Sequence, residues 1–115
     1  MLLRVDASSA QPLHEQIAGQ IRGAIAAGDL NAGDRLPPGK ELAASLDVNV
    51  HTALRAYQSL RDEGLLEVRR GRGTIVTGQA PELAGVTRIA EQLVREARRV
   101  ALSDDDIRRL LEVNL

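Results

Sequence analysis

Arginine and glycine are concentrated in one short segment, VRRGRGTIV, at residues 68–76. Its charged and flexible positions are Arg69, Arg70, Gly71, Arg72 and Gly73. Guanidinium groups bind phosphate oxygens or enter the minor groove of DNA, and glycine allows a tight turn whose backbone closely approaches a nucleic-acid strand. The alternative is a hairpin tip that faces only water, but such a tip gains nothing from the mutual repulsion of three cations. The segment therefore favours contact with a polyanion.

A second group of polar side chains recurs at helical spacing over residues 50–63. At about 100° per residue, one face holds His51, Thr52, Arg55, Gln58, Ser59 and Asp62, and the opposite face holds Val50, Ala53, Tyr57 and Leu60. A helix fits the major groove of DNA, where Arg55 could bind guanine through two hydrogen bonds and Asn49 could contact a base or a phosphate. The alternative is an ordinary amphipathic helix with a solvated face and Asn49 as its N-cap.

The element that comes first along the chain is a helix over residues 12–27. Apolar residues recur there at every fourth position, Pro12 suits the first helical position, and Gly28 suits the left-handed residue that ends a helix. The loop that follows is expected to fold Leu30 and Leu36 onto the core.

A short second helix is predicted over residues 39–46. After a turn at residues 47–49, the third helix runs to residue 63 and stops at Gly64. Two short helices joined by a tight turn, the second with a polar face, form a helix-turn-helix pattern at about residues 39–58.

A β-hairpin is predicted after the third helix. Residues 65–69 alternate loosely between apolar and charged side chains, with Leu66 and Val68 expected to face inward. A strand rich in β-branched residues follows the glycine turn. This hairpin, at about residues 65–77, is the wing of a winged helix. The predicted fold class is α+β, mainly α, with a winged helix-turn-helix domain at residues 11–78.

Residues 79–115 are predicted to be a short helical dimerisation segment. The apolar face of its first helix holds Leu83, Val86, Ile89, Ala90, Leu93, Val94, Ala97 and Val100. This face either packs on its own domain or pairs with a second copy. The chain has one Tyr and no Phe or Trp, so a small domain with so modest a core favours pairing.

The charged residues of this segment have two interpretations. Its arginines are Arg88, Arg95, Arg98 and Arg99. They could form a second DNA patch, but Glu91 and Glu96 interleave with them and favour an ion-paired, solvated face. Ser103 precedes three aspartates at residues 104–106, which favours a capped helix start over a site for a divalent cation.

Composition excludes several classes of function. The 115 residues carry a net charge of −1, and residues 1–78 hold nine basic and nine acidic residues, so a polyanion must be met by a local patch. Without cysteine, and with no ligand at metal spacing from His14 or His51, neither a metal, a cofactor nor an enzyme activity is expected. Neither a membrane span nor a signal peptide is recognised, which predicts a cytoplasmic protein.

Residues 12–76 resemble the winged-helix domain of the GntR family of bacterial transcription regulators. The motifs "GDRLP", "ELA", "EGL" and "GRGT" carry this resemblance in combination, and N-x-x-T followed by "RAYQSL" resembles the YtrA subfamily. The resemblance implies repression of transcription and dimerisation through two short C-terminal helices. The DNA contacts that it implies are Arg35, Lys40, Asn49, His51, Thr52, Arg55, Arg70, Gly71 and Arg72.

Several positions depart from the family pattern. Residues 38–40 are Pro-Gly-Lys where the family usually has Ser-Glu-Arg, so the second helix is expected to begin later or to fray. Asp47 replaces a usual glycine, and aspartate is among the residues that tolerate the left-handed conformation. Many members carry arginine at the place of Leu54, whereas here the arginine is Arg55, so the base preference is expected to differ.

These observations predict a dimeric repressor that binds an inverted-repeat operator in double-stranded DNA. A small effector between the C-terminal helices is compatible with this prediction. The main alternative is a winged-helix module whose third helix and wing bind another protein.

Overall fold

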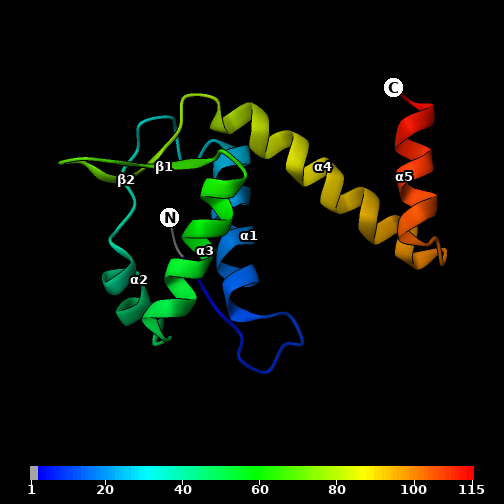
Figure 1. Ribbon diagram of the computed structural model, residues 1–115. Helices are drawn as coiled ribbons and strands as arrows, with labels where there is room; N and C mark the ends of the chain where they lie inside the picture. The colour runs from blue at the N-terminus through cyan, green and yellow to red at the C-terminus, as the bar shows by residue number, and fades with distance from the viewer. Residues whose placement is uncertain (1–2) are drawn as a thin grey trace. The chain divides into compact units, whose positions relative to one another are not determined.

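The computed structural model describes residues 3–115, and its elements are labelled in Figure 1. They are α1 (Leu13–Ala27), α2 (Gly39–Leu46), α3 (Val50–Asp62), β1 (Leu66–Arg69), β2 (Gly73–Val76), α4 (Ala80–Arg99) and α5 (Asp104–Val113). The chain forms two compact units, Met1–Gly85 and Val86–Leu115. The first unit has the element order of a winged helix, and the predicted α+β, mainly α fold class is confirmed.

Helix α1 forms where isoleucine recurs at every fourth residue. Ile17, Ile21 and Ile25 are fully buried along one stripe of the helix. Pro12 is the N-cap rather than the first helical residue, because its ψ of 144° is extended. Gly28 ends the helix with a φ of 84°, a left-handed conformation that glycine adopts at little cost.

Helix α2 begins at Gly39, directly after Pro38, although no side chain caps it. The prediction of a later start is therefore wrong. The first turn forms without a side-chain cap, and its first backbone bond runs from the N–H of Leu42 to the carbonyl of Pro38 at 3.0 Å. Asp47 ends the helix with a φ of 53°, which confirms that aspartate adopts the left-handed conformation of the turn.

Helix α3 has the cap that the sequence predicts. The Asn49 side chain accepts a hydrogen bond from the N–H of His51 at 2.8 Å. The helix ends at Asp62, one residue earlier than predicted, and Gly64 follows with a φ of 80°. Its buried face consists of Ala53, Ala56, Tyr57 and Leu60.

Strands β1 and β2 pair antiparallel, from Leu66 opposite Val76 to Arg69 opposite Gly73 at the tip. Leu66 and Val76 are buried, but Val68, predicted to face inward, is 59% exposed. A two-stranded ribbon places alternate side chains in the core only where it lies over that core. The prediction for Val68 is wrong because the hairpin, the wing of the fold, extends beyond the helices (Figure 1).

The loop before α2 lies along the outer edge of β2. An antiparallel bridge joins Arg35 to Ile75, and the N–H of Leu36 donates to the carbonyl of Thr74 at 2.9 Å. These backbone bonds fix the position of Arg35 beside the wing.

The core of the first unit is aliphatic apart from Tyr57. Leu30 and Leu36 are buried on it, as predicted for the loop. The Tyr57 hydroxyl donates to the carbonyl of Pro37 at 2.6 Å, so this side chain joins α3 to the segment that precedes α2. Burial of the phenol raises the pKa of Tyr57 to about 12.

An ion pair that sequence reasoning missed joins α1 to the residue after α3. Arg22 Nη2 and Glu63 Oε2 are 2.8 Å apart, and the two side chains are 10% and 24% exposed. The signal in the sequence is the place of Arg22 beside Ile21, on the buried side of α1. Because the pair is largely removed from water, loss of one partner leaves a charge that is costly to keep.

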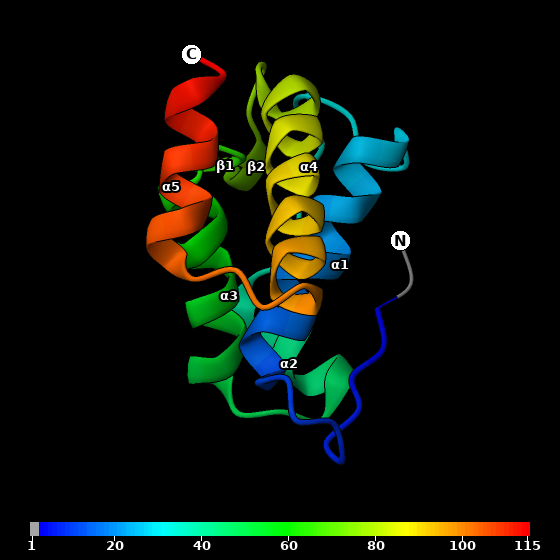
Figure 2. The same cartoon turned by 90° about the vertical axis from the view of Figure 1, so that its right-hand side faces the viewer.

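The second unit contains the remainder of α4 and helix α5, joined by a turn that Figure 2 shows. Ala101 in this turn is left-handed, with a φ of 62°. Ser103 accepts from the N–H of Asp106 and donates its own N–H to the Asp106 side chain, so the predicted cap is confirmed as a capping box. None of the helices in residues 3–115 is long and apolar enough to cross a membrane.

Candidate nucleic-acid interface

The tip of the wing presents its cations to solvent. Arg69, Arg70 and Arg72 are all exposed. Arg69 pairs with Glu67 across 2.9 Å, whereas neither Arg70 nor Arg72 forms an ion pair within residues 3–115. Positive charge is therefore concentrated at the turn itself, where two guanidinium groups are available to an external anion.

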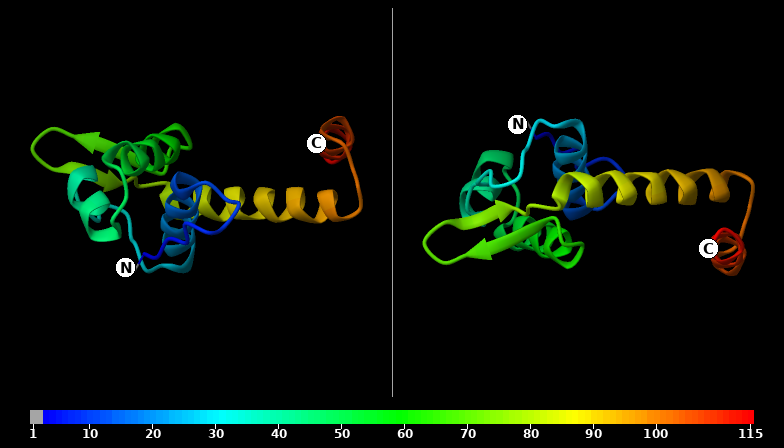
Figure 3. Two further views of the ribbon diagram at one scale, coloured as in Figure 1. Left: turned by 90° about the horizontal axis from the view of Figure 1, so that it is seen from below. Right: turned by 90° about the horizontal axis from the view of Figure 1, so that it is seen from above.

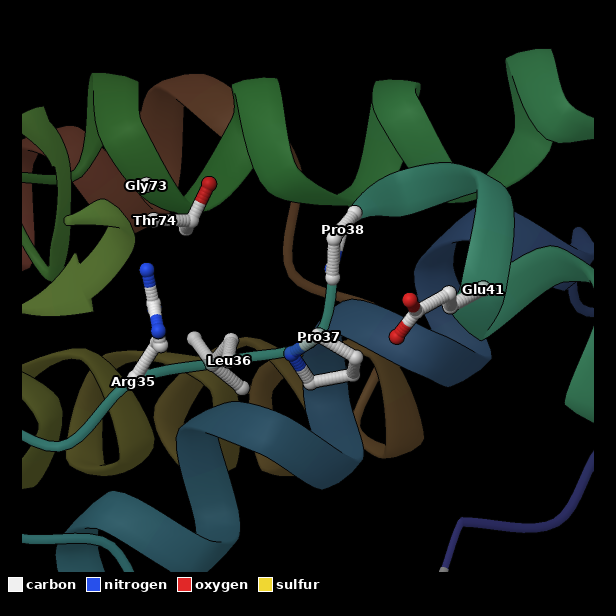
Figure 4. A pocket seen from close by; sticks show the side chains of 7 residues that line it. All are labelled: Arg35, Leu36, Pro37, Pro38, Glu41, Gly73 and Thr74. Atoms are coloured by element: carbon white, nitrogen blue, oxygen red, sulfur yellow. The ribbon is translucent and has the colours of Figure 1, made fainter. Parts of the chain in front are cut away.

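A hydrogen bond connects this tip to the loop before α2. Arg35 Nε donates to the backbone carbonyl of Arg72 at 2.7 Å, and Figure 4 shows the Arg35 side chain extending toward Gly73 and Thr74. Gly71 and Gly73 have φ values of 79° and 77°, a region that favours glycine. Arg35 thus adds a further guanidinium group to the surface of the wing.

The predicted polar face of α3 is largely open. His51, Arg55 and Gln58 are exposed, and Thr52 is half-buried. Within the helix, Gln58 Nε2 donates to an Asp62 carboxylate oxygen at 2.8 Å. Because the Asn49 side-chain oxygen serves as the helix cap, the cap is confirmed, while an Asn49 contact with a base stays a prediction.

The wing, α2 and α3 lie on the same side of α1 in the views of Figure 1 and Figure 3. Lys40 is exposed in the first turn of α2. Helix α3 packs against both α1 and α2, and these two contacts fix its orientation. The wing, α2 and α3 thus lie on one side of α1, and a single DNA-binding face made of their cations and polar side chains stays a prediction.

A cavity of about 610 Å³ lies between the wing and the start of α2 (Figure 4). It is lined by Arg35, Leu36, Pro37, Pro38, Glu41, Gly73 and Thr74. Arg35 and Glu41 enter it from opposite ends. Because the Glu41 carboxylate repels anions, the outer arginines of the wing are better placed than this cavity to bind a phosphate group.

Sequence reasoning missed an apolar part of this face. Val50, which the helical spacing groups with Ala53 and Tyr57, is 36% exposed, and Leu54 is 47% exposed. A Cβ atom on Gly39 would lie 2.6 Å from Leu54 Cδ2. The Leu54 side chain therefore covers Gly39, and this contact gives a reason for glycine at the start of α2.

The predicted dimerisation residues differ in their exposure. Leu83 packs against the core of the first unit, in which Ala80 and Ala84 are buried, and Ala97 is also buried. The remaining positions are exposed or half-exposed: Val86, Ile89, Ala90, Leu93, Val94 and Val100. Their pairing with a second copy stays a prediction.

The arginines at the end of α4 contact carboxylates. Arg99 pairs with Glu96 across 2.9 Å, and Arg98 pairs with Asp104. The Arg98 guanidinium lowers the pKa of Asp104, and hydrogen bonds from Ser103 lower the pKa of Asp106. These ion pairs favour the solvated interpretation of both arginines over a second DNA patch.

The histidines and the aspartate run do not form a metal centre in the part of the chain that the structure describes. His14 is half-buried on α1, and His51 is exposed on α3. Within residues 3–115, no three side chains of His, Cys, Asp or Glu are placed to hold a metal ion.

Comparison with known proteins identifies the class. Residues 13–76 match the family described as "Bacterial regulatory proteins, gntR family". An HTH-type transcriptional regulator of Mycobacterium tuberculosis is 35% identical over 109 residues, which cover 95% of this chain and 90% of that protein. The HTH-type transcriptional repressor YtrA of Bacillus subtilis is 36% identical over 95 residues, or 80% of this chain and 73% of that protein.

A solved structure gives the same result. YtrA from Sulfolobus acidocaldarius, a GntR-family transcription factor, is similar with a TM-score of 0.63 and 36% identity over 80% of this chain and 99% of that chain. The matches confirm the resemblance predicted from the sequence motifs, and they belong to transcription regulators rather than enzymes. This chain is therefore a member of the GntR family, a YtrA-like regulator of transcription that binds DNA.

Proposed function

We propose that this regulator is a homodimeric repressor that binds an inverted-repeat operator through α3 and the wing. The observation that carries the proposal is the hydrogen bond from Arg35 to the carbonyl of Arg72, 2.7 Å long. It holds the cationic wing tip against the loop that leads into the helix-turn-helix. A duplex that receives α3 in its major groove then meets the wing along the adjacent backbone or minor groove.

The residues of this surface have two proposed roles. His51, Thr52 and Arg55, on the first half of α3, contact base edges. The residues proposed to contact the backbone or the minor groove are Arg35, Lys40, Asn49, Arg69, Arg70, Gly71, Arg72 and Gly73. Of the wing arginines, Arg70 and Arg72 contribute most, because Arg69 already pairs with Glu67.

Dimerisation is proposed to occur through α4. Val86 and Ile89 are 66% and 68% exposed, which is unusual for large apolar side chains that recur on one helix. Pairing of these faces between two copies would present two winged helices together, and two-fold symmetry of the protein favours an operator made of two inverted half-sites. Repression is proposed because a related protein of similar length is named as a repressor.

Selection of bound duplexes from a random pool tests the proposal. We expect an enriched inverted repeat whose half-sites are separated by about one helical turn. If a dimer neutralises about six phosphates, the logarithm of affinity falls with the logarithm of salt concentration at a slope near −5. Enrichment of a single unrepeated site would contradict the dimeric arrangement. Failure to retain any duplex at low salt would overturn the proposal in favour of a protein-binding module.

A further inference from the structure

Two large apolar side chains are exposed among the polar residues of α3. Leu54 is 47% exposed and Val50, one helical turn before it, is 36% exposed. On the same half of the helix, His51 and Arg55 are also exposed. Hydrogen-bonding groups and apolar groups therefore occupy adjacent positions on the surface that the proposed function places in the major groove.

Leu54 is held in position by α2. Gly39 is buried, and a Cβ atom there would lie 2.6 Å from Leu54 Cδ2 and 3.2 Å from Leu54 Cγ. The side chain consequently rests on the first residue of α2, beside the exposed Lys40, rather than moving freely in solvent. Val50 lies on the same side of α3, because four residues make slightly more than one turn.

An apolar side chain in the major groove has one natural partner. The C5-methyl group of thymine is the apolar group that a base pair presents there, whereas the other groups are hydrogen-bond donors and acceptors. Leu54 and Val50 cannot hydrogen bond through their side chains, so they gain from groove binding only where they contact such a methyl group.

We propose that Leu54, supported by Val50, reads thymine through its methyl group and is a specificity-determining residue of this regulator. The inference rests on the proposed function, because it requires α3 to enter the major groove. Arg55 and His51 then select bases by hydrogen bonding, and Leu54 selects a thymine in the same half-site.

Replacement of thymine by uracil tests this role, because deoxyuridine lacks the methyl group and keeps the Watson–Crick pair. Each thymine of the selected duplex is replaced in turn, and the affinity is measured at fixed salt. For the thymine that Leu54 contacts, wild-type protein is expected to lose about fourfold in affinity per half-site, the value of one buried methylene-sized group.

Three variants connect the effect to Leu54. Leu54→Ala is expected to bind the thymine and uracil duplexes equally at that position, whereas Leu54→Met, which keeps an apolar contact, retains most of the preference. Gln58→Ala, a matched change at an exposed neighbour, should leave the preference unchanged. Because Leu54 is exposed, these changes are expected to preserve the fold, and circular dichroism checks this.

Gly39→Ala tests the support from α2. The new Cβ would force Leu54 to rotate, so the preference for thymine should fall while affinity for the uracil duplex stays close to that of the wild type. Equal binding of thymine and uracil duplexes by the wild type at every position would overturn the inference alone. An undiminished thymine preference in Leu54→Ala would do the same. If the wild type bound no duplex at all, the proposed function would fail as well.

Discussion

The wing tip and helix α3 are held by the molecule in different ways. The tip is attached to the rest of the first unit by the Arg35 hydrogen bond and by its own strands, and its arginines are exposed. Helix α3 is anchored along its length: Tyr57 bonds to Pro37, and Glu63, just after the helix, pairs with Arg22. One region presents charge on a hairpin that few contacts hold at its tip, and the other presents side chains on a helix that contacts hold at several points.

The difference matches two physical requirements of DNA recognition. Phosphate contacts depend on charge and tolerate small shifts of a long side chain, so they supply affinity on any sequence. Base reading needs side chains held to within a fraction of an ångström by packing and hydrogen bonds. We therefore expect changes at the wing to act on all duplexes alike, and changes around α3 to act on stability and on the choice of sequence.

The largest effect is expected from breaking the anchor at the end of α3. Glu63→Gln removes the negative charge that pairs with the largely buried Arg22 guanidinium, which should lower the free energy of unfolding by roughly 2–3 kcal/mol. Urea denaturation at neutral pH measures the change. Glu96→Gln removes the exposed pair with Arg99 and is the matched control, with an expected change below about 0.5 kcal/mol. Similar losses in the two variants would show that α3 is not anchored by this pair.

The next effect concerns sequence choice. Arg55→Ala should cost roughly 1–3 kcal/mol of binding free energy on the preferred duplex and much less on duplexes altered at the base pair that Arg55 reads. Binding curves for a panel of single-substituted duplexes measure this selectivity. An equal loss on every duplex would contradict base reading and would make Arg55 a backbone contact like those of the wing.

At the wing, Arg72→Ala is expected to weaken binding about tenfold on specific and non-specific duplexes alike, without changing the free energy of unfolding. The salt slope of a dimer should become shallower by about 2, since one phosphate contact is lost in each protomer. The control is Arg108→Ala on α5, where the exposed guanidinium pairs with Asp105. A loss restricted to the preferred sequence would contradict the division between the two regions.

The contrast between these regions also explains what could be predicted from the sequence. The helices and the wing follow from local signals: isoleucine every fourth residue in α1, the Asn49 cap, and glycines where φ is positive. Such signals involve neighbours along the chain, so one sequence is enough to recognise them. The family motifs likewise predict the order in which these elements follow one another.

What the sequence did not predict depends on contacts between distant residues. Val68 follows the strand alternation yet is exposed, because the length of wing that lies over the core is set by tertiary packing. The Gly39–Leu54 contact and the Arg22–Glu63 pair each join two elements that are far apart in the chain. Val50 belongs to the apolar side of α3 and is still 36% exposed, because a helical wheel takes no account of which positions other elements cover.

The smallest expected effect belongs to Tyr57, which ties α3 to the segment before α2. Tyr57→Phe keeps the ring but removes the hydrogen bond to the Pro37 carbonyl, so the free energy of unfolding should fall by about 1 kcal/mol at neutral pH. Equilibrium denaturation measures this loss. The affinity for non-specific duplexes should hardly change, because the substitution leaves the wing unaltered.

A second test follows how the difference in unfolding free energy between wild type and Tyr57→Phe depends on pH. The folded protein keeps the Tyr57 proton up to a pKa of about 12, whereas the unfolded chain loses it near the ordinary value of 10. The raised pKa therefore stabilises the fold below pH 10, and that contribution is lost as the pH rises toward 12. The difference in the free energy of unfolding between wild type and Tyr57→Phe should accordingly become smaller as the pH rises from 10 toward 12. Because the chain has one tyrosine and one lysine, few other groups titrate there, and phenolate absorbance follows Tyr57 directly. If the free energies of unfolding of the two proteins changed in parallel above pH 10, the fold would not be holding the phenol neutral. The Tyr57 ring would then anchor α3 by packing alone.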